Sequence, residues 1–185
     1  KGDAFIGPSG TTSGVSSMNV SGEVFYSGND VELEDAEVPD GFTGASNFGN
    51  LTVGGKNEVT IPTGYRYYDS ISVTGQSTLT FATGARVYVN TDFTIGGMAQ
   101  VITQGSVEIY LGGSGNFGGQ GIINATGSPS NLQLYGLGDG ATLSFSGLND
   151  FYGTIYAPDS NVSMSGNAGY FGAVVGDAVT LGGNA

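Results

Sequence analysis

The sequence predicts an all-β protein built as a parallel β-helix, or β-solenoid, with coils of about 17–22 residues. Three observations support this fold class. Apolar residues alternate with polar ones at a period of two, which is typical of half-buried strands. The short strands share one residue pattern. That pattern recurs at intervals of roughly 20 residues, as it does in solenoid proteins.

The recurring pattern is an apolar residue, an outward residue, a second apolar residue, a small residue and a glycine. Its copies occupy positions 18–22, 51–55, 71–75, 93–97, 109–113, 143–147, 162–166 and 179–183. The copies that start at 51, 71 and 93 follow one another at steps of 20 and 22, and those that start at 143, 162 and 179 at steps of 19 and 17. The copies predict about eight coils, or a rod about 40 Å long at the spacing of parallel strands.

Each copy also predicts which side chains face the interior. The first and third residues point to one side of a strand, and the second points to the other. Stacked coils therefore form an aliphatic interior column of Leu51 and Val53, Ile71 and Val73, and Phe93 and Ile95. The middle residues form an outer polar stripe of Thr52, Ser72, Thr94, Ser144, Ser163 and Thr180. The closing glycine supplies the left-handed or tight corner that leads into the next side.

The remaining segments complete a single domain over residues 1–185. Residues 1–14 are rich in Gly, Ser and Thr and are a candidate flexible or linking arm. An acidic loop spans residues 29–41, and the one segment compatible with a helical turn lies at residues 30–36. The alternative fold is an antiparallel β-sandwich, whose strands also alternate. The only clean hairpin signal is Asp139-Gly140.

Charge and composition exclude several classes of function. The chain has 16 Asp and Glu against 4 Lys and Arg, a net charge of −12, so it lacks the basic patch that binding of nucleic acid requires. It has no His and no Cys, which excludes a Ser-His-Asp triad, a thiolate nucleophile and ordinary zinc or haem ligation. No apolar run approaches the roughly 18 residues of a membrane helix, so we expect no membrane span in this chain. We expect no enzyme, no catalytic residues and no resident cofactor.

From residue 64 onward, over about two thirds of the chain, the sequence resembles a known family. The resemblance rests on residues 88–89, 93–97, 107–110, 128–136, 151–158, 162–166 and 170–176. Its most specific part is Phe-Tyr-Gly-Thr-Ile-Tyr-Ala-Pro at 151–158. Together these segments resemble the β-helical domain of uncharacterised function found in PilX-like type IV pilus assembly proteins and related bacterial surface proteins. The resemblance implies an exported, surface-displayed or filament-associated role, and it carries no catalytic residues.

The densest charged feature is an acidic run without a basic residue, formed by Asp30, Glu32, Glu34, Asp35, Glu37 and Asp40. One interpretation is a calcium site, because Ca²⁺ prefers several carboxylate oxygens, but the spacing is not that of an EF-hand loop. A solvated loop that keeps the protein soluble is favoured, and a docking patch for a basic partner is a third interpretation.

Three other groups are candidates for a site. Asn90-Thr91-Asp92 matches a tripeptide of polygalacturonases, but the carboxylates and basic residues that accompany it there are missing, so Asp92 is expected to be a corner residue. Lys56, Arg66 and Arg86 are candidates for a polysaccharide lyase by elimination only. The aromatic candidates are Tyr65, Tyr67, Tyr68, Phe151, Tyr152, Tyr156, Tyr170 and Phe171. The spacing of 19 between Phe151 and Tyr170 favours a stacked ladder over a sugar-binding or protein-binding surface.

These observations predict a non-catalytic extracellular or cell-surface structural protein, either a surface-filament subunit or a pilus-associated adhesive module. The expected partners are further copies of the chain in a filament, or pilus proteins. The alternatives are a carbohydrate-active β-helix enzyme, either a polysaccharide lyase or a hydrolase, and a module that binds calcium or sugar.

Overall fold

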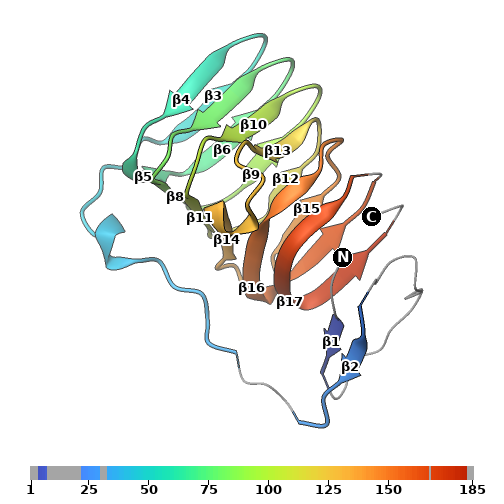
Figure 1. Ribbon diagram of the computed structural model, residues 1–185. Coiled ribbons are helices and arrows are strands. Elements are labelled where there is room, and N and C mark those ends of the chain that lie inside the picture. Colours follow the sequence, from blue (N-terminus) through green and yellow to red (C-terminus); the bar gives the residue numbers. More distant parts are fainter. Residues whose placement is uncertain (1–3, 8–21, 30–32, 167, 183–185) are drawn as a thin grey trace.

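The computed structural model describes residues 4–7, 22–29, 33–166 and 168–182. Within them the chain winds into a parallel β-solenoid of about six turns (Figure 1). Every described strand pair is parallel. The predicted parallel β-helix is therefore confirmed, and the antiparallel sandwich is wrong. Among the described residues, no helix is long and apolar enough to cross a membrane.

The turns form three faces. The first face contains β3 (Asn50–Val53), β6 (Ser70–Val73), β9 (Phe93–Ile95), β12 (Gly115–Phe117) and β15 (Thr142–Phe145). The second contains β4 (Glu58–Ile61), β7 (Thr78–Phe81), β10 (Gln100–Thr103) and β13 (Gly121–Asn124). The third contains β5 (Gly64–Tyr68), β8 (Ala85–Val89), β11 (Val107–Leu111) and β14 (Leu132–Gly136). The long strands β16 (Phe151–Met164) and β17 (Tyr170–Leu181) bend from the third face into the first.

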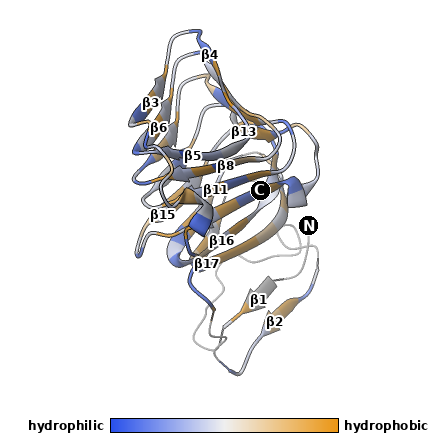
Figure 2. Ribbon diagram, turned by 90° about the vertical axis from the view of Figure 1, so that its left-hand side faces the viewer, coloured by the Kyte–Doolittle hydropathy of each residue, from blue (hydrophilic) through white to orange (hydrophobic). Residues whose placement is uncertain are grey.

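The register of the first face matches the predicted one. Leu51 pairs with Ile71 and Ile71 with Phe93, and the same column ends with Val162 opposite Val179. The outer stripe follows the same register, which places Thr52 beside Ser72 and Ser72 beside Thr94. Figure 2 shows the resulting alternation of apolar and polar residues along the stacked strands. The alternation in the sequence therefore identified the interior side correctly.

The number of turns is smaller than predicted, because not every copy of the pattern belongs to the first face. Ile109 lies in β11 on the third face, where it pairs with Val87 and Leu134. The copy at 18–22 lies almost entirely outside the described residues. One strand of the first face, β12, escaped the pattern because Gly115 stands where the other copies have a large apolar residue. The ring of Phe117 fills that space, and a Cβ at Gly115 would lie 2.6 Å from it.

Coil length also departs from the predicted range of about 17–22 residues. Gly115 pairs with Leu143, 28 positions later, because residues 125–131 form an extra loop that contains the 3-10 turn η2 (Pro129–Asn131). In the described part of the chain the second face has no strand after β13, and residues 146–150 lead directly from β15 to β16. The last two turns are therefore shorter than the earlier ones because they have two strands instead of three.

Two stacked glycines show how the corners are made. Gly75 and Gly97 follow β6 and β9 with φ of +74° and +70°, a region that favours glycine. A Cβ at Gly75 would lie 2.8 Å from the carbonyl oxygen of Gly55 one turn earlier. The corner therefore requires glycine for its backbone conformation and for the close approach of the neighbouring coil.

The interior contains a file of aromatic rings. Phe93 and Phe117 lie 5.4 Å apart between ring centroids, and Phe117 and Phe145 lie 4.7 Å apart. The file continues through Phe151 to Tyr170, the predicted ladder pair, at 6.4 Å. Aromatic pairs at these distances stabilise the core beyond the area that they bury.

The two described N-terminal strands lie outside the solenoid. β1 (Ala4–Ile6) pairs with β2 (Val24–Tyr26), and both views place this small sheet beyond the end formed by β17 (Figures 1 and 2). The proposed arm at 1–14 therefore contributes β1, and its other residues, apart from residue 7, lie outside the described part. Residues 33–48, here called the strap, run along the third face toward β3. Residues 33–36 contain no helix, and the only helical turn in residues 33–48 is the 3-10 turn η1 (Asp40–Phe42).

Candidate functional site: the tyrosine face

The outer side of the third face carries a column of tyrosines, and this surface is here called the tyrosine face. The column consists of Tyr67, Tyr88, Tyr110, Tyr135 and Tyr156, each paired in register with the next. In-register parallel strands place equivalent side chains about 4.8 Å apart, close to the distance at which rings stack. Tyr67 and Tyr88 stack at 5.0 Å, and Tyr110 and Tyr135 at 4.7 Å with an interplanar angle of 6°. In each of these two pairs, one ring therefore covers a face of the other.

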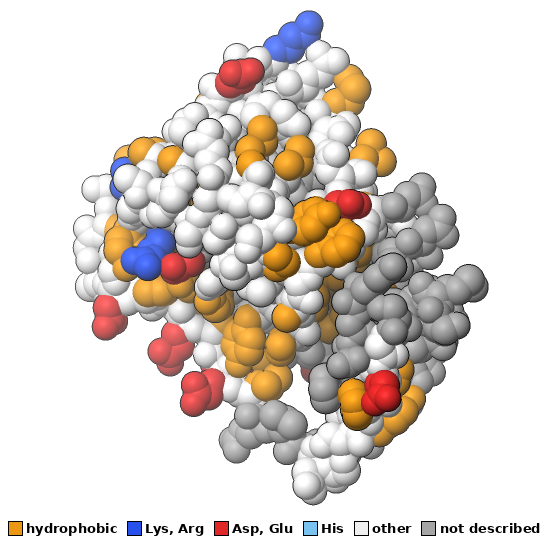
Figure 3. Space-filling view, viewed as in Figure 1, with side chains coloured by type: hydrophobic (Ala, Val, Ile, Leu, Met, Phe, Trp, Pro, Cys, Tyr) orange, Lys and Arg blue, Asp and Glu red, His pale blue; other side chains and the backbone are white. Residues whose placement is uncertain are grey.

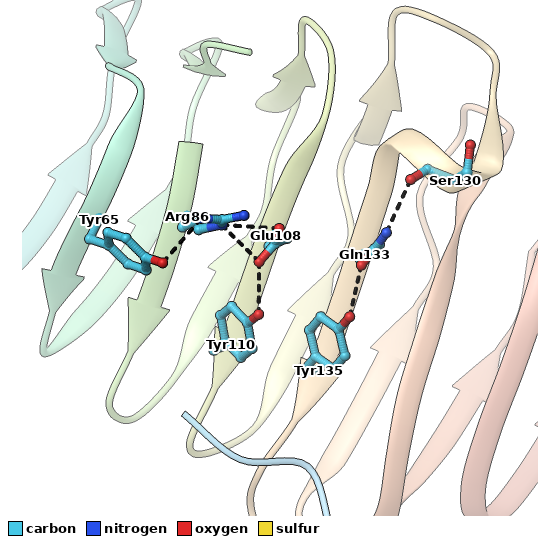
Figure 4. A network of polar contacts seen from close by, with 7 residues as sticks. All are labelled: Tyr65, Arg86, Glu108, Tyr110, Ser130, Gln133 and Tyr135. Atoms are coloured by element: carbon cyan, nitrogen blue, oxygen red, sulfur yellow. Dashed lines mark hydrogen bonds and ion pairs between the residues drawn. The ribbon is translucent and has the colours of Figure 1, made fainter. Parts of the chain in front are cut away.

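A polar column runs beside the tyrosines, two residues earlier in each strand. Arg86 in β8 faces Glu108 in β11, and its Nε lies 3.1 Å from both carboxylate oxygens (Figure 4). A guanidinium Nη1 donates to the hydroxyl of Tyr65 at 3.1 Å, and the guanidinium carbon lies 5.3 Å from the centroid of that ring. The hydroxyl of Tyr110 donates to Glu108 at 2.8 Å. The carboxylate is thus engaged by one cation and one phenol.

The next turn repeats the arrangement without charge. The hydroxyl of Tyr135 donates to Oε1 of Gln133 at 2.7 Å, and Nε2 of Gln133 donates to the carbonyl oxygen of Ser130 at 3.3 Å (Figure 4). Gln133 therefore takes the place that Glu108 has one turn earlier. The face changes from an ion pair to a neutral amide while its hydrogen bonds to tyrosine continue.

The electrostatics keep the phenols protonated. Burial raises the pKa of Tyr110 well above its ordinary value, and the hydrogen bond to Glu108 raises it further. Burial likewise raises the pKa of Tyr135 and of Tyr88. The hydrogen bond to Glu108 raises the pKa of Arg86. These tyrosines are therefore protonated hydrogen-bond donors at neutral pH, and none of them is a phenolate that could act as a general base.

The strap covers part of this face through one buried aromatic ring. Phe42 meets the rings of Tyr65, Tyr88 and Tyr110 edge to face, at 4.9, 5.9 and 5.7 Å between centroids. A residue larger than glycine at position 41 would force the ring of Tyr65 to shift, because a Cβ there would overlap it. Phe42 therefore bridges three successive turns of the solenoid.

Polar contacts hold the strap near both of its ends. The hydroxyl of Tyr156 donates to the carbonyl oxygen of Glu34. At the other end the backbone N–H of Phe48 donates to the carbonyl oxygen of Tyr67 at 2.9 Å, and the side-chain amide of Asn47 donates to Asp69 at 2.6 Å. The strap thus spans the face from β16 to the outer edge of β5.

The acidic run lies mostly in the strap. Glu34, Asp35 and Glu37, together with Leu33, line an open and shallow hollow at the surface. Figure 3 shows separate acidic side chains that project along this side of the molecule. Within the described part of the chain, no three His, Cys, Asp or Glu side chains gather closely enough to hold a metal ion. Residues 30–32, which include Asp30 and Glu32, lie outside that part.

The structure shows where Asp92 and the three basic candidates from the sequence lie. Asp92 lies at the corner between β8 and β9, where its carboxylate accepts the N–H of Ser114 at 3.0 Å, so its expected role is confirmed. The three basic candidates do not converge. Lys56 lies in the turn between β3 and β4, Arg66 bonds the backbone of the adjacent Tyr65, and Arg86 pairs with Glu108.

A further aromatic pair, separate from the ladder that was predicted to fill the coil, stacks on the outside of the last turns. Tyr152 stacks on Phe171 at 4.5 Å with an angle of 7°. The sequence interpretation missed the alternating column of Arg86, Glu108 and Gln133. Its signal was available, because the segments at 85–89, 107–111 and 132–136 share a polar second residue and, except for their last position, the same alternation with Tyr in fourth place.

The fold and this face together define a β-solenoid protein whose third face carries stacked tyrosines beside hydrogen-bonded polar side chains. The sequence matches the family described as a domain of unknown function (DUF7305) over residues 18–185. The chain therefore belongs to that family. No curated protein and no solved structure matches it.

Proposed function

We propose that this chain is a non-catalytic structural protein of the cell surface, either a surface-filament subunit or an adhesive module associated with a pilus. The observation that carries the proposal is that the described end strands of the solenoid each leave one edge without a paired strand. Among the described strands, β3 and β4 at one end pair only with the following turn, and β17 at the other end pairs only with β16. Open strand edges are sites at which a further strand can add.

The tyrosine face supports the non-catalytic part of the proposal. Glycoside hydrolysis requires two carboxyl groups on opposite sides of the scissile bond. Glu108 is instead bound by Arg86 and Tyr110, and the strap packs against the same tyrosine. The resemblance of residues 64–185 to the β-helical domain of PilX-like proteins supports a role at a pilus or cell surface.

Electron microscopy of the negatively stained protein, with and without millimolar calcium, tests the filament form. Regular filaments would support a self-assembling subunit, and filaments only with calcium would assign the acidic run a role in assembly. Isolated short rods in both conditions would exclude the filament form and leave the adhesive module.

A turnover assay tests the enzymatic alternative. The intact protein is incubated with a panel of neutral and acidic polysaccharides, and release of reducing ends or of unsaturated products is measured. We expect no release. Turnover that Glu108→Gln abolishes would overturn the proposal in favour of a carbohydrate-active enzyme, whereas Glu37→Gln in the exposed strap is the matched control.

A further inference from the structure

At the end of the solenoid formed by β17, here called the tail, interior positions are uncovered. Val179 and Leu181 stand in the interior column, in register with Val162 and Met164, which are almost completely buried. Yet Val179 is 44% exposed and Leu181 is 48% exposed. Among the described residues no strand follows residues 178–181 on the first face. The interior column ends at these residues, so its last apolar side chains are exposed at the tail.

The opposite end, here called the head, has a matching feature. Residues 47–49 lie on the outer edge of β5, where Asn47 forms a parallel bridge with Tyr67. The next residue, Phe48, is therefore level with Tyr68, which is buried in the interior. Phe48 packs against Tyr68 at 5.5 Å between centroids but remains 57% exposed. It is an interior aromatic position with no turn beyond it among the described residues.

The head has the shape of the turn that would follow the tail in a longer solenoid. At the tail the chain passes first along the third face, with residues 170–176, and then along the first face, with residues 178–181, because β17 bends from one face to the other. At the head the chain likewise starts on the third face, with residues 47–49, and continues into β3 on the first face. A head placed on a tail therefore continues both faces at once. β3 would pair with residues 178–181, and residues 47–49 would pair with residues 175–177.

The side chains brought together in this register also match. β3 reads Asn-Leu-Thr-Val and residues 178–181 read Ala-Val-Thr-Leu, so the two interior pairs are apolar, threonine meets threonine, and Asn50 meets Ala178 on the outer side. On the third face, the residue of β17 that stands in the same register position as Tyr68 is Gly176. The exposed ring of Phe48 would therefore meet the smallest residue of the tail.

Charge favours contact between unlike ends. Residues 142–182 contain three acidic residues and no basic one, whereas residues 50–69 contain two acidic and two basic residues. Contact of tail with tail would bring together two surfaces of the same sign, and contact of tail with head would not. Figure 3 shows a basic side chain projecting from the end of the molecule where the first turn lies.

From these observations we propose that a second copy of this chain docks head to tail, with β3 and residues 47–49 of one copy on the outer edge of β17 of the next. The contact is heterologous and does not close, so it propagates a filament. It rests on the proposed function and assigns the partner and the contact surface of the filament form. The β1–β2 sheet lies beyond the end formed by β17 without strand pairing to it (Figures 1 and 2), so the proposed contact requires this sheet to be displaced to the side of the joined ends.

Cysteine cross-linking tests the contact, because the chain has no native cysteine. Thr52→Cys and Thr180→Cys change two exposed outer residues that the proposed register places about 4.8 Å apart, within the range of a disulfide. A mixture of the two single variants under mild oxidation should form covalent dimers, and the double variant should form longer ladders. Ser163→Cys lies one turn before Thr180 and, mixed with Thr52→Cys, should form no dimer.

The outcomes separate the contact from the function. Covalent dimers of Thr180→Cys alone would show contact of tail with tail and overturn the proposal. Filaments of the wild-type protein without a cross-link between positions 52 and 180 would also overturn the contact but leave the filament function. Neither filaments nor cross-links would refute both.

A second pair of variants tests the same contact without cysteine. Phe48→Asp places a charge at the head and should reduce the protein to single rods by microscopy and to monomers by light scattering. Met98→Asp changes a residue of similar exposure, 58%, in the turn between β9 and β10, away from both ends. It should assemble like the wild-type protein. Equal assembly of both variants would overturn the proposal.

Discussion

Val73→Asp compared with Ser72→Asp tests the register that defines the solenoid. Val73 is completely buried and stands between Val53 and Ile95 in the interior column. Ser72 points outward, and its hydroxyl oxygen accepts a hydrogen bond from Thr94 at 3.2 Å. The two positions are adjacent in the chain and differ only in the side of the strand that they occupy.

The expected magnitudes differ several-fold. Full burial of a valine side chain contributes about 1.5–3 kcal/mol, which Val73→Asp removes. A carboxylate in the interior costs several kcal/mol more, so the total is roughly 5 kcal/mol or above. Domains of this kind have a net stability of about 5–15 kcal/mol. The substitution should therefore unfold the solenoid or at least separate its first turns from the rest, because each turn is held mainly by its neighbours.

Ser72→Asp should change the free energy of unfolding by less than about 1 kcal/mol, as is usual for surface positions. Urea denaturation followed by circular dichroism measures both variants. A loss of the folded baseline or a broken, two-step transition is expected only for Val73→Asp. Equal midpoints for the two variants would refute the inward and outward assignment of the first face.

Three further predictions concern the strap, a corner and the buried phenols. Phe42→Ala removes the ring that meets three tyrosines, a change that costs about 3–5 kcal/mol in a core, and it should increase hydrogen exchange in residues 33–48 while the solenoid strands stay protected. Uniform loss of protection would contradict this. Gly75→Ala should destabilise the protein by at least about 1 kcal/mol, because φ is positive and the new methyl would crowd Gly55, whereas Gly54→Ala, without either constraint, should be nearly neutral in thermal melts. The raised pKa of Tyr110 means that the unfolded state loses its phenol proton near the ordinary value of about 10 while the folded state keeps it, so stability should fall as pH rises above 10. Tyr110→Phe should reduce that fall in denaturant titrations at alkaline pH, and an unchanged pH dependence would argue against a buried phenol there.

Local patterns predicted much of the fold because they repeat. The alternation at residues 51–53, 71–73 and 93–95 assigned the interior column correctly, since a period of two leaves only two ways to face a strand. The same reasoning misplaced Ile109, because strands of the first and third faces have the same alternation. It missed Gly115, whose interior place is filled by the ring of a different residue.

The candidate site was predicted less well. The sequence singled out Tyr67 and Tyr156 of the tyrosine column and the acidic run, but not Tyr88, Tyr110 or Tyr135. It also predicted a ladder of rings inside the coil, where Phe151 and Tyr170 lie 6.4 Å apart. It did not anticipate that Glu108 pairs with Arg86 or that Phe42 packs on Tyr110. Those contacts join residues from different turns and from the strap, so no local spacing reports them.

The sequence by itself determined the parallel solenoid, the side of each first-face strand that is buried, and the glycine corners. These features depend on the stereochemistry of residues close together in the chain, and they recur in each coil. Only the tertiary structure decided which strands share a face, where the second face ends, and where the strap lies. These depend on the fit between side chains that are distant in the sequence, where the volume of one ring, such as Phe117 beside Gly115 or Phe42 among the tyrosines, decides what can pack.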